Sequence, residues 1–208
     1  MKGLLLKDFT LLFKVCKSFL IIMVVFFVII PFSDSYSFLN YYLIILSAMI
    51  PFTLIAYDEK EKWDVYVKTL PVTNSDYVSA KYLTGIISNA VVLVILVLLR
   101  SAFYSNTNDL IAYASFLLII GTVFMSINLP IVFKFGSAKG RIVNFVLIAV
   151  ICVFILLAAK FSTSSLGLVL NVISGKYNVP LYLGVIGALL LLAASWLISI
   201  AVYNKKEK

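Results

Sequence analysis

The stretch that decides the fold is Phe38–Leu99, in which two apolar runs enclose a charged segment. The first run reads FLNYYLIILSAMIPFTLIAY (38–57) and the second reads YLTGIISNAVVLVILVLL (82–99). Each run has about the 20 mainly apolar residues that a helix needs to cross a bilayer. Between them, Asp58–Pro71 reads DEKEKWDVYVKTLP. The pattern predicts two membrane-spanning helices joined by a charged segment outside the membrane.

The charged segment has the pattern of an amphipathic helix. If 58–71 is helical, Trp63, Tyr66, Val67 and Leu70 share one side at i, i+3, i+4 and i+7. The charged residues fall mostly around the rest of the helix, and Pro71 ends it. An aromatic face on such a helix predicts a docking element, and the alternative is a solvated loop with incidental charge.

The composition is that of an integral membrane protein. Of the 208 residues, 63% are hydrophobic and 12% are charged, and the mean hydropathy is +1.11. Soluble domains have about 45–50% apolar and about 25% charged residues. We therefore expect one all-α transmembrane domain over residues 1–208. Histidine is absent and the carboxylates are scattered, so no conventional metal site is expected. The expected partners do not include nucleic acid.

The apolar runs extend to six predicted spans with both termini on one side. We place the spans at Phe19–Phe32, Phe38–Tyr57, Tyr82–Leu99, Leu110–Phe133, Ile142–Ala159 and Pro180–Tyr203. Fourteen of the 17 Lys and Arg residues then lie on the side of the termini and of 58–71, and the positive-inside rule makes that side cytoplasmic. Residues 160–179 lie outside, where LGLVLNVI is too short to span and predicts a short external or re-entrant helix.

Residues 1–17 predict an amphipathic helix in the membrane interface. Lys7, Thr10, Lys14 and Lys17 form a polar stripe at helical spacing, opposite a row of Leu and Phe residues. We expect Lys7, Lys14 and Lys17 to act as interfacial anchors that face anionic headgroups.

The chemistry of the spans excludes some functions. No predicted span has an ionisable residue near its middle, which disfavours an ion-coupled carrier. No GxxxxGK[ST] motif is present, so the energy for any active transport must come from a partner. The polar residues Asn89, Asn128 and Pro130 within spans are expected to serve helix packing, Pro130 by freeing a backbone carbonyl, or to line a pathway for an amphipathic cargo.

Two stretches resemble a known family. EKEKWDVYVKTLPVTNSDYVSAKYL, Glu59–Leu83, resembles the loop between the second and third spans of ABC-2-type permeases, the membrane subunits of one class of ATP-binding-cassette exporters. LPIVFKFGSAKGR, Leu129–Arg141, resembles a second signature of that family. Within the family, the chain looks most similar to the permeases of phenol-soluble modulin exporters, which are found in Gram-positive bacteria.

The resemblance implies a function and a set of partners. It makes 58–71 a coupling helix that docks on a cytoplasmic ATPase, with Glu59, Glu61, Trp63, Tyr66, Val67 and Leu70 in contact. It also implies a second permease, either identical or paralogous, and an amphipathic cytolytic or antimicrobial peptide as cargo. The chain itself would then hold no cofactor and would not be an enzyme, because ATP and Mg would bind the partner ATPase.

A function of a different class stays open. A non-transporting immunity or sensor protein could bind such peptides in the bilayer and signal to a cytoplasmic partner through the same charged segment.

Overall fold

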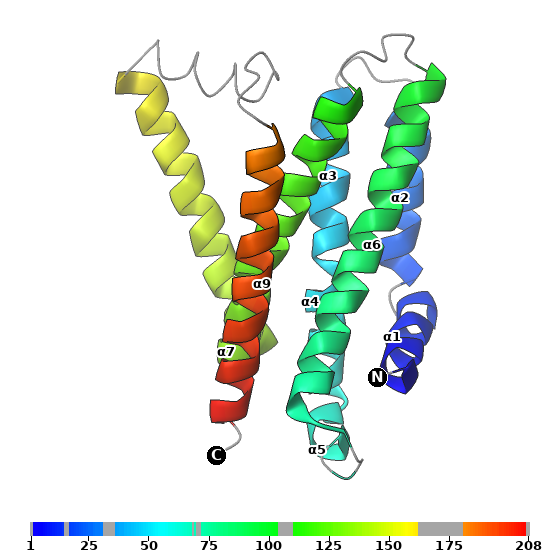
Figure 1. The fold of residues 1–208 in the computed structure, drawn as a ribbon, viewed down its shortest axis with the longest axis vertical. Coiled ribbons are helices and arrows are strands. Elements are labelled where there is room, and N and C mark those ends of the chain that lie inside the picture. The colour runs from blue at the N-terminus through cyan, green and yellow to red at the C-terminus, as the bar shows by residue number, and fades with distance from the viewer. Residues whose placement is uncertain are drawn as a thin grey trace.

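The computed structural model describes residues 2–14, 17–30, 36–67, 69, 72–103, 110–161 and 181–206, and in these ranges it contains helices and short connections without a strand. Both termini and α5 lie at the same end of the bundle (Figure 1). Because the described residues form helices and no strand, the all-helical class predicted from the apolar runs is confirmed for this part of the chain. The helices are α1 (Lys2–Lys14), α2 (Lys17–Ile29), α3 (Tyr36–Ala48), α4 (Ile50–Lys60), α5 (Trp63–Val67), α6 (Asn74–Phe103), α7 (Leu110–Phe161) and α9 (Leu181–Lys206).

Four segments of the described chain are long and apolar enough to cross a membrane. They are Leu39–Lys60, Asn74–Phe103, Leu110–Val143 and Leu183–Lys205, and Leu20–Ile29 is a shorter apolar helix. These four confirm the predicted spans that begin at Phe38, Tyr82, Leu110 and Pro180. The spans predicted at Phe19–Phe32 and Ile142–Ala159 are not among them.

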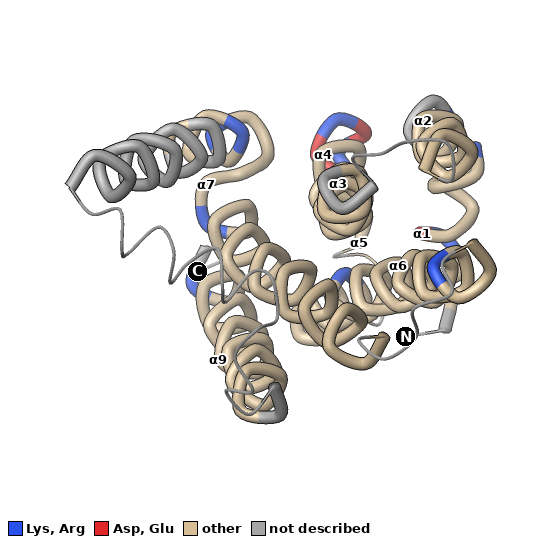
Figure 2. The backbone as a smooth tube through the Cα atoms, turned by 90° about the horizontal axis from the view of Figure 1, so that it is seen from above, with Lys and Arg blue, Asp and Glu red and all other residues tan. Residues whose placement is uncertain are grey.

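The first of these spans is built from α3 and α4, which lie over one another when the bundle is viewed from above (Figure 2). Met49 between them has near-helical torsions, with φ −84° and ψ −8°. Its N–H donates to Ile45 O at 3.1 Å, and its carbonyl accepts from Thr53 N at 3.0 Å. Because the hydrogen bonds continue across Met49, α3 and α4 act as one span.

Helix α7 turns back on itself at Gly136. A straight helix of its 52 residues would be about 78 Å long, more than twice the roughly 30 Å thickness of a bilayer's hydrocarbon core. Gly136 instead has φ 80° and ψ 168°, and the chain then returns toward the end of the bundle where α7 began (Figure 1). A β-carbon at Gly140 would lie 3.3 Å from Val132 Cγ2. The chain therefore turns between the predicted spans 110–133 and 142–159, and Gly136 divides α7 into a first arm, 110–135, and a second arm, 137–161.

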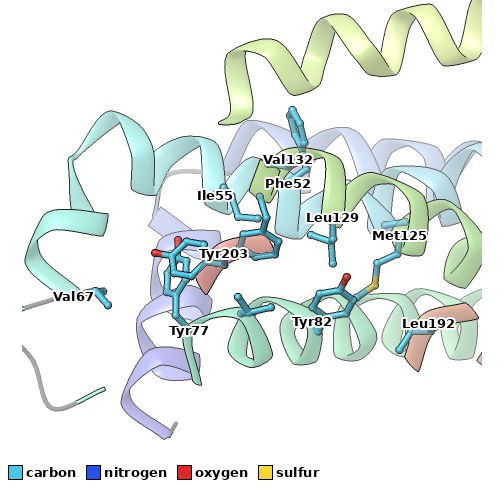
Figure 3. Close-up of a cluster of buried hydrophobic side chains, with 13 residues drawn as sticks. Phe52, Ile55, Val67, Tyr77, Tyr82, Met125, Leu129, Val132, Leu192 and Tyr203 are labelled. Carbon is cyan, nitrogen blue, oxygen red and sulfur yellow. The ribbon is translucent and has the colours of Figure 1, made fainter. Parts of the chain in front are cut away.

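Two apolar clusters hold the helices together. One lies between α1, α2, α3, α4, α6 and the first arm of α7, and it includes Leu12, Leu43 and Leu117. The other joins α4, α5, α6, the first arm of α7 and α9; Figure 3 shows Val67 of α5 at one end of it and Tyr77 beside Tyr203. Many large apolar residues on the outer faces of the spans are exposed, as expected for surfaces in contact with lipid.

The structure corrects the single helix predicted over 58–71. Helix α4 continues through Asp58 and ends at Lys60, and α5 begins at Trp63. Lys62 between them has a left-handed φ of 53°, so the helix cannot continue through it. Lys68, Leu70 and Pro71 lie outside the described residues, as do residues 162–180 and thus nearly all of the predicted external segment 160–179.

Candidate functional site: a buried charge cluster beside α5

Four charged side chains meet inside the bundle at the end that holds α5 and the termini. Lys7 and Asp8 come from α1, Asp58 from α4 and Lys81 from α6. Lys81 is 1% exposed and Asp8 is 2% exposed. We call these four residues the charge cluster.

Lys81 lies at the centre of the cluster, between two carboxylates. Its Nζ donates to Asp8 Oδ1 at 2.7 Å and lies 2.7 Å from Asp58 Oδ2. Lys7 also pairs with Asp58, and its Nζ is 3.8 Å from Asp8 Oδ1. Burial of a charge costs several kcal/mol unless an opposite charge compensates it. Because two cations face two carboxylates, the cluster is neutral as a whole and each member depends on the others.

Two hydroxyl groups donate further hydrogen bonds to the carboxylates of the cluster, and one of them connects the cluster to further helices. The Tyr77 hydroxyl donates to Asp58 Oδ2 at 3.0 Å, and Thr84 Oγ1 donates to Asp8 Oδ2 at 3.4 Å. The Tyr77 ring lies 5.4 Å from the ring of Tyr203 on α9 and 6.4 Å from that of Phe133 on α7. The cluster thus joins α1, α4 and α6 directly, and α7 and α9 through Tyr77.

Helix α5 contacts the cluster through Trp63. Lys7 Nζ lies 4.1 Å above the centre of the Trp63 ring, a cation–π geometry. Burial lowers the pKa of the Lys7 ammonium and the Lys81 charge lowers it further, while the hydrogen bond and charge of Asp58 and the charge of Asp8 oppose the shift. The Trp63 ring also lies 5.0 Å from Tyr66. A displacement of α5 would therefore act on Lys7 and, through it, on α1 and α4.

The other residues predicted to dock on an ATPase lie in different environments. Tyr66 is 54% exposed, whereas Val67 is 4% exposed and packs in the second apolar cluster. Glu61 is exposed. Glu59 instead points to the turn of α7, where its Oε2 accepts a hydrogen bond from Ser137 N at 2.8 Å. Leu70 is outside the described residues.

The three predicted interfacial anchors also lie in different environments. Lys14 and Lys17 are exposed, as an anchor requires. Lys7 lies in the charge cluster, because the buried carboxylates of Asp8 and Asp58 need a positive partner. Lys7 therefore points inward, and the expectation that it faces headgroups is corrected.

Pro130 contributes to helix packing in the way the sequence predicts. A proline has no N–H, so Pro130 leaves the carbonyl of Ser126, four residues earlier, without its helical partner. Ser195 of α9 donates its hydroxyl to Ser126 O at 2.7 Å, and the Tyr82 hydroxyl lies 2.7 Å from Ser195 Oγ. The freed Ser126 carbonyl thus accepts an interhelical hydrogen bond that joins α7 to α9.

Asn89 and Asn128, the two asparagines singled out from the sequence, differ in the contacts they make. Asn128 Nδ2 donates to Phe124 O at 2.8 Å within α7. Asn89 Oδ1 accepts from Ser47 Oγ at 2.5 Å, which joins α6 to α3. Asn89 also lines a largely apolar cavity of about 270 Å³ between α3, α6, α7 and α9, together with Leu117 and Leu192.

Asp8, Asp58 and Lys81 were missed as a group by the sequence reasoning. Each lies at a predicted span boundary or in the interfacial helix, where a charge is ordinarily solvated. Their sequence signal is weak: Asp8 is the only acidic residue in a lysine-containing apolar helix, and Lys81 follows small residues on a helix that buries this face.

These features define the class of the protein as a helical membrane protein that carries a short helix, α5, beside a charge cluster at one end of its spans. The chain belongs to the ABC-2 transporter family, because the model of that family, described as ABC-2 family transporter protein, matches residues 3–204. Permeases of this family pair with an ATP-binding-cassette ATPase at the membrane. Comparison with curated proteins and with solved structures gave no significant match.

Proposed function

We propose that this chain is the permease subunit of an ATP-binding-cassette exporter that expels amphipathic peptides. The observation that carries the proposal is the placement of α5, which leaves Tyr66 exposed while Trp63 contacts the charge cluster through Lys7. Together with the family match over 3–204, this placement suits a helix that receives motion from outside the membrane and passes it to the spans.

The proposed topology has six spans with both termini in the cytoplasm of a Gram-positive bacterium. Helix α2 and the second arm of α7 would supply the two further spans. The location of most Lys and Arg residues at the end that includes α5 supports this orientation. In it, α5 faces the compartment that contains ATP.

In the proposed cycle, ATP and Mg bind the partner ATPase and this chain provides no catalytic residue. Closure of the ATPase pair would push α5 through Tyr66 and the exposed charges near it. The push would reach α1 through the contact of Trp63 with Lys7, and α6 through Asp58 and Lys81. Two permeases, identical or paralogous, would enclose the conduit.

The spans support an amphipathic rather than an ionic cargo. The cavity that Asn89 lines is otherwise almost entirely apolar, and the charged residues of the cluster are already neutralised by one another. An amphipathic peptide can place its apolar face against such a surface at little desolvation cost.

Copurification with the ATPase tests the docking role of α5. Tyr66→Ala should weaken the complex by about 30-fold, the effect of losing an aromatic hot spot of about 2 kcal/mol. Phe103→Ala is the matched control, since Phe103 is an exposed aromatic residue at the other end of α6. Equal recovery of the ATPase with both variants would refute docking through Tyr66.

Peptide resistance that persists after deletion of the ATPase would favour an immunity protein.

A further inference from the structure

Asp58 and Glu59 are neighbours at the end of α4, yet they contact different parts of the protein. Asp58 pairs with Lys7 of α1 and Lys81 of α6. Glu59 Oε2 accepts a hydrogen bond from Ser137 N, at the start of the second arm of α7. Consecutive side chains on an α-helix point in directions about 100° apart, so one turn of α4 can contact helices on two different sides. The last turn of α4 is therefore bonded to α1, α6 and α7.

The contact at Ser137 has the chemistry of a helix N-cap supplied by another helix. The first N–H groups of a helix lack partners within it, and a carboxylate stabilises them through a hydrogen bond and the helix dipole. Gly136, immediately before, has a φ of 80°, which residues with a side chain rarely adopt. A β-carbon at Gly136 would also lie 3.3 Å from Glu59 Oε1. The turn of α7 is thus closely fitted to the Glu59 carboxylate.

We propose that Glu59 is a positioning residue that fixes the turn of α7 to α4, so that the second arm of α7 follows α4 when α5 is displaced. Only Glu61 and Lys62 separate α4 from α5, so a force on α5 acts first on the turn that carries Glu59. The consequence for transport rests on the proposed function, but the contact itself is a property of this chain alone. In this proposal Glu59 transmits motion within the permease, in place of docking on the ATPase.

Limited proteolysis tests the contact without any partner. Lys139 and Arg141 are exposed in the first turns of the second arm, and trypsin cleaves after both when the helix start opens. In proteoliposomes of the full chain, Glu59→Ala should raise the cleavage rate after these residues about fivefold, the effect of losing a typical N-cap. Glu59→Gln should cleave close to the wild-type rate, because the amide oxygen still accepts from Ser137 N. Glu61→Ala, which removes an exposed carboxylate two residues away, is the control.

Equal cleavage of Glu59→Ala and wild type would overturn the proposal. Gly136→Ala disturbs the same contact from the side of α7 and should also speed cleavage, which keeps the test decisive if Glu59→Ala folds poorly. An unchanged rate in Gly136→Ala would likewise contradict the proposal.

The role in transport needs a separate measurement in the complex with the ATPase. Glu59→Ala should retain copurification and ATP hydrolysis within about twofold of wild type while peptide transport falls by about fivefold, the factor that corresponds to the loss of a typical N-cap contact. Loss of copurification would assign Glu59 to docking and overturn the proposal, and so would normal transport. If the wild-type chain itself binds no ATPase, the proposed function fails while the proteolysis result stands independently.

Discussion

Removal of the Lys81 charge should be one of the most damaging single changes in this chain. Lys81 is fully buried, and its Nζ lies 2.7 Å from a carboxylate oxygen of Asp8 and 2.7 Å from one of Asp58. Lys81→Met fills a similar volume but leaves two buried carboxylates with Lys7 as their remaining cation in the cluster. Breaking a buried ion pair in this way costs about 3–5 kcal/mol.

The loss can be measured as a change in thermal unfolding. For a chain of this length, each kcal/mol shifts Tm by about 2–4 °C, so Lys81→Met should lower Tm by about 6–20 °C. The assay is unfolding of the purified protein in detergent micelles, followed by circular dichroism. Lys139→Met is the matched control, since Lys139 is exposed on α7, and its Tm should change by no more than about 2 °C, as is usual for exposed positions.

A compensating substitution separates charge imbalance from a simple packing defect. Asp8→Asn added to Lys81→Met restores neutrality, with Lys7 facing Asp58, and should recover at least half of the lost Tm. Two outcomes would refute the reasoning: a decrease in Lys81→Met no larger than in Lys139→Met, or a double variant less stable than Lys81→Met alone.

Two further predictions concern the packing of the spans, both read as Tm in the same assay. Ser195→Ala leaves the Ser126 carbonyl without its interhelical donor and should cost about 1–3 kcal/mol of stability. Adding Pro130→Ala to this variant should restore stability, because alanine supplies the missing N–H to the same carbonyl. No recovery of Tm in the double variant would contradict the pairing. Gly121→Ala places a β-carbon 2.9 Å from Asn89 Oδ1 and should cost about 1–3 kcal/mol by separating α6 and α7. Asn89→Ala should relieve part of that cost, and a neutral Gly121→Ala would show that the helices are less closely packed than the structure indicates.

The parts of the fold that the sequence predicts well are those set by hydrophobicity over long windows. The run 82–99 is long, apolar and uncharged enough to predict a membrane span, and it lies within α6. The predicted spans 110–133 and 142–159 leave a short interruption between them, and the chain turns within it at Gly136. Pro130 was predicted to free a carbonyl because that effect is local to one helix.

The charge cluster was missed because it depends on contacts between distant segments. Asp8 meets Lys81 across 73 positions of sequence, and nothing in the periodicity of either segment specifies the other as its partner. Lys7 illustrates the error: its spacing fits an interfacial stripe, but the two nearby carboxylates attract it inward. The division of 58–71 was missed for a related reason, since Glu61 and Lys62 are ordinary helix residues and tertiary contacts of Glu59 and Val67 set the break.

Peptide uptake into inside-out vesicles tests the central claim most directly. Vesicles containing this chain and its ATPase should accumulate a fluorescent amphipathic helical peptide when ATP is added. Accumulation should stop with a hydrolysis-deficient ATPase, and it should fall sharply with Tyr66→Ala but not with Phe103→Ala. Accumulation that persists without the ATPase, or that collapses with a protonophore at constant ATP, would contradict the account.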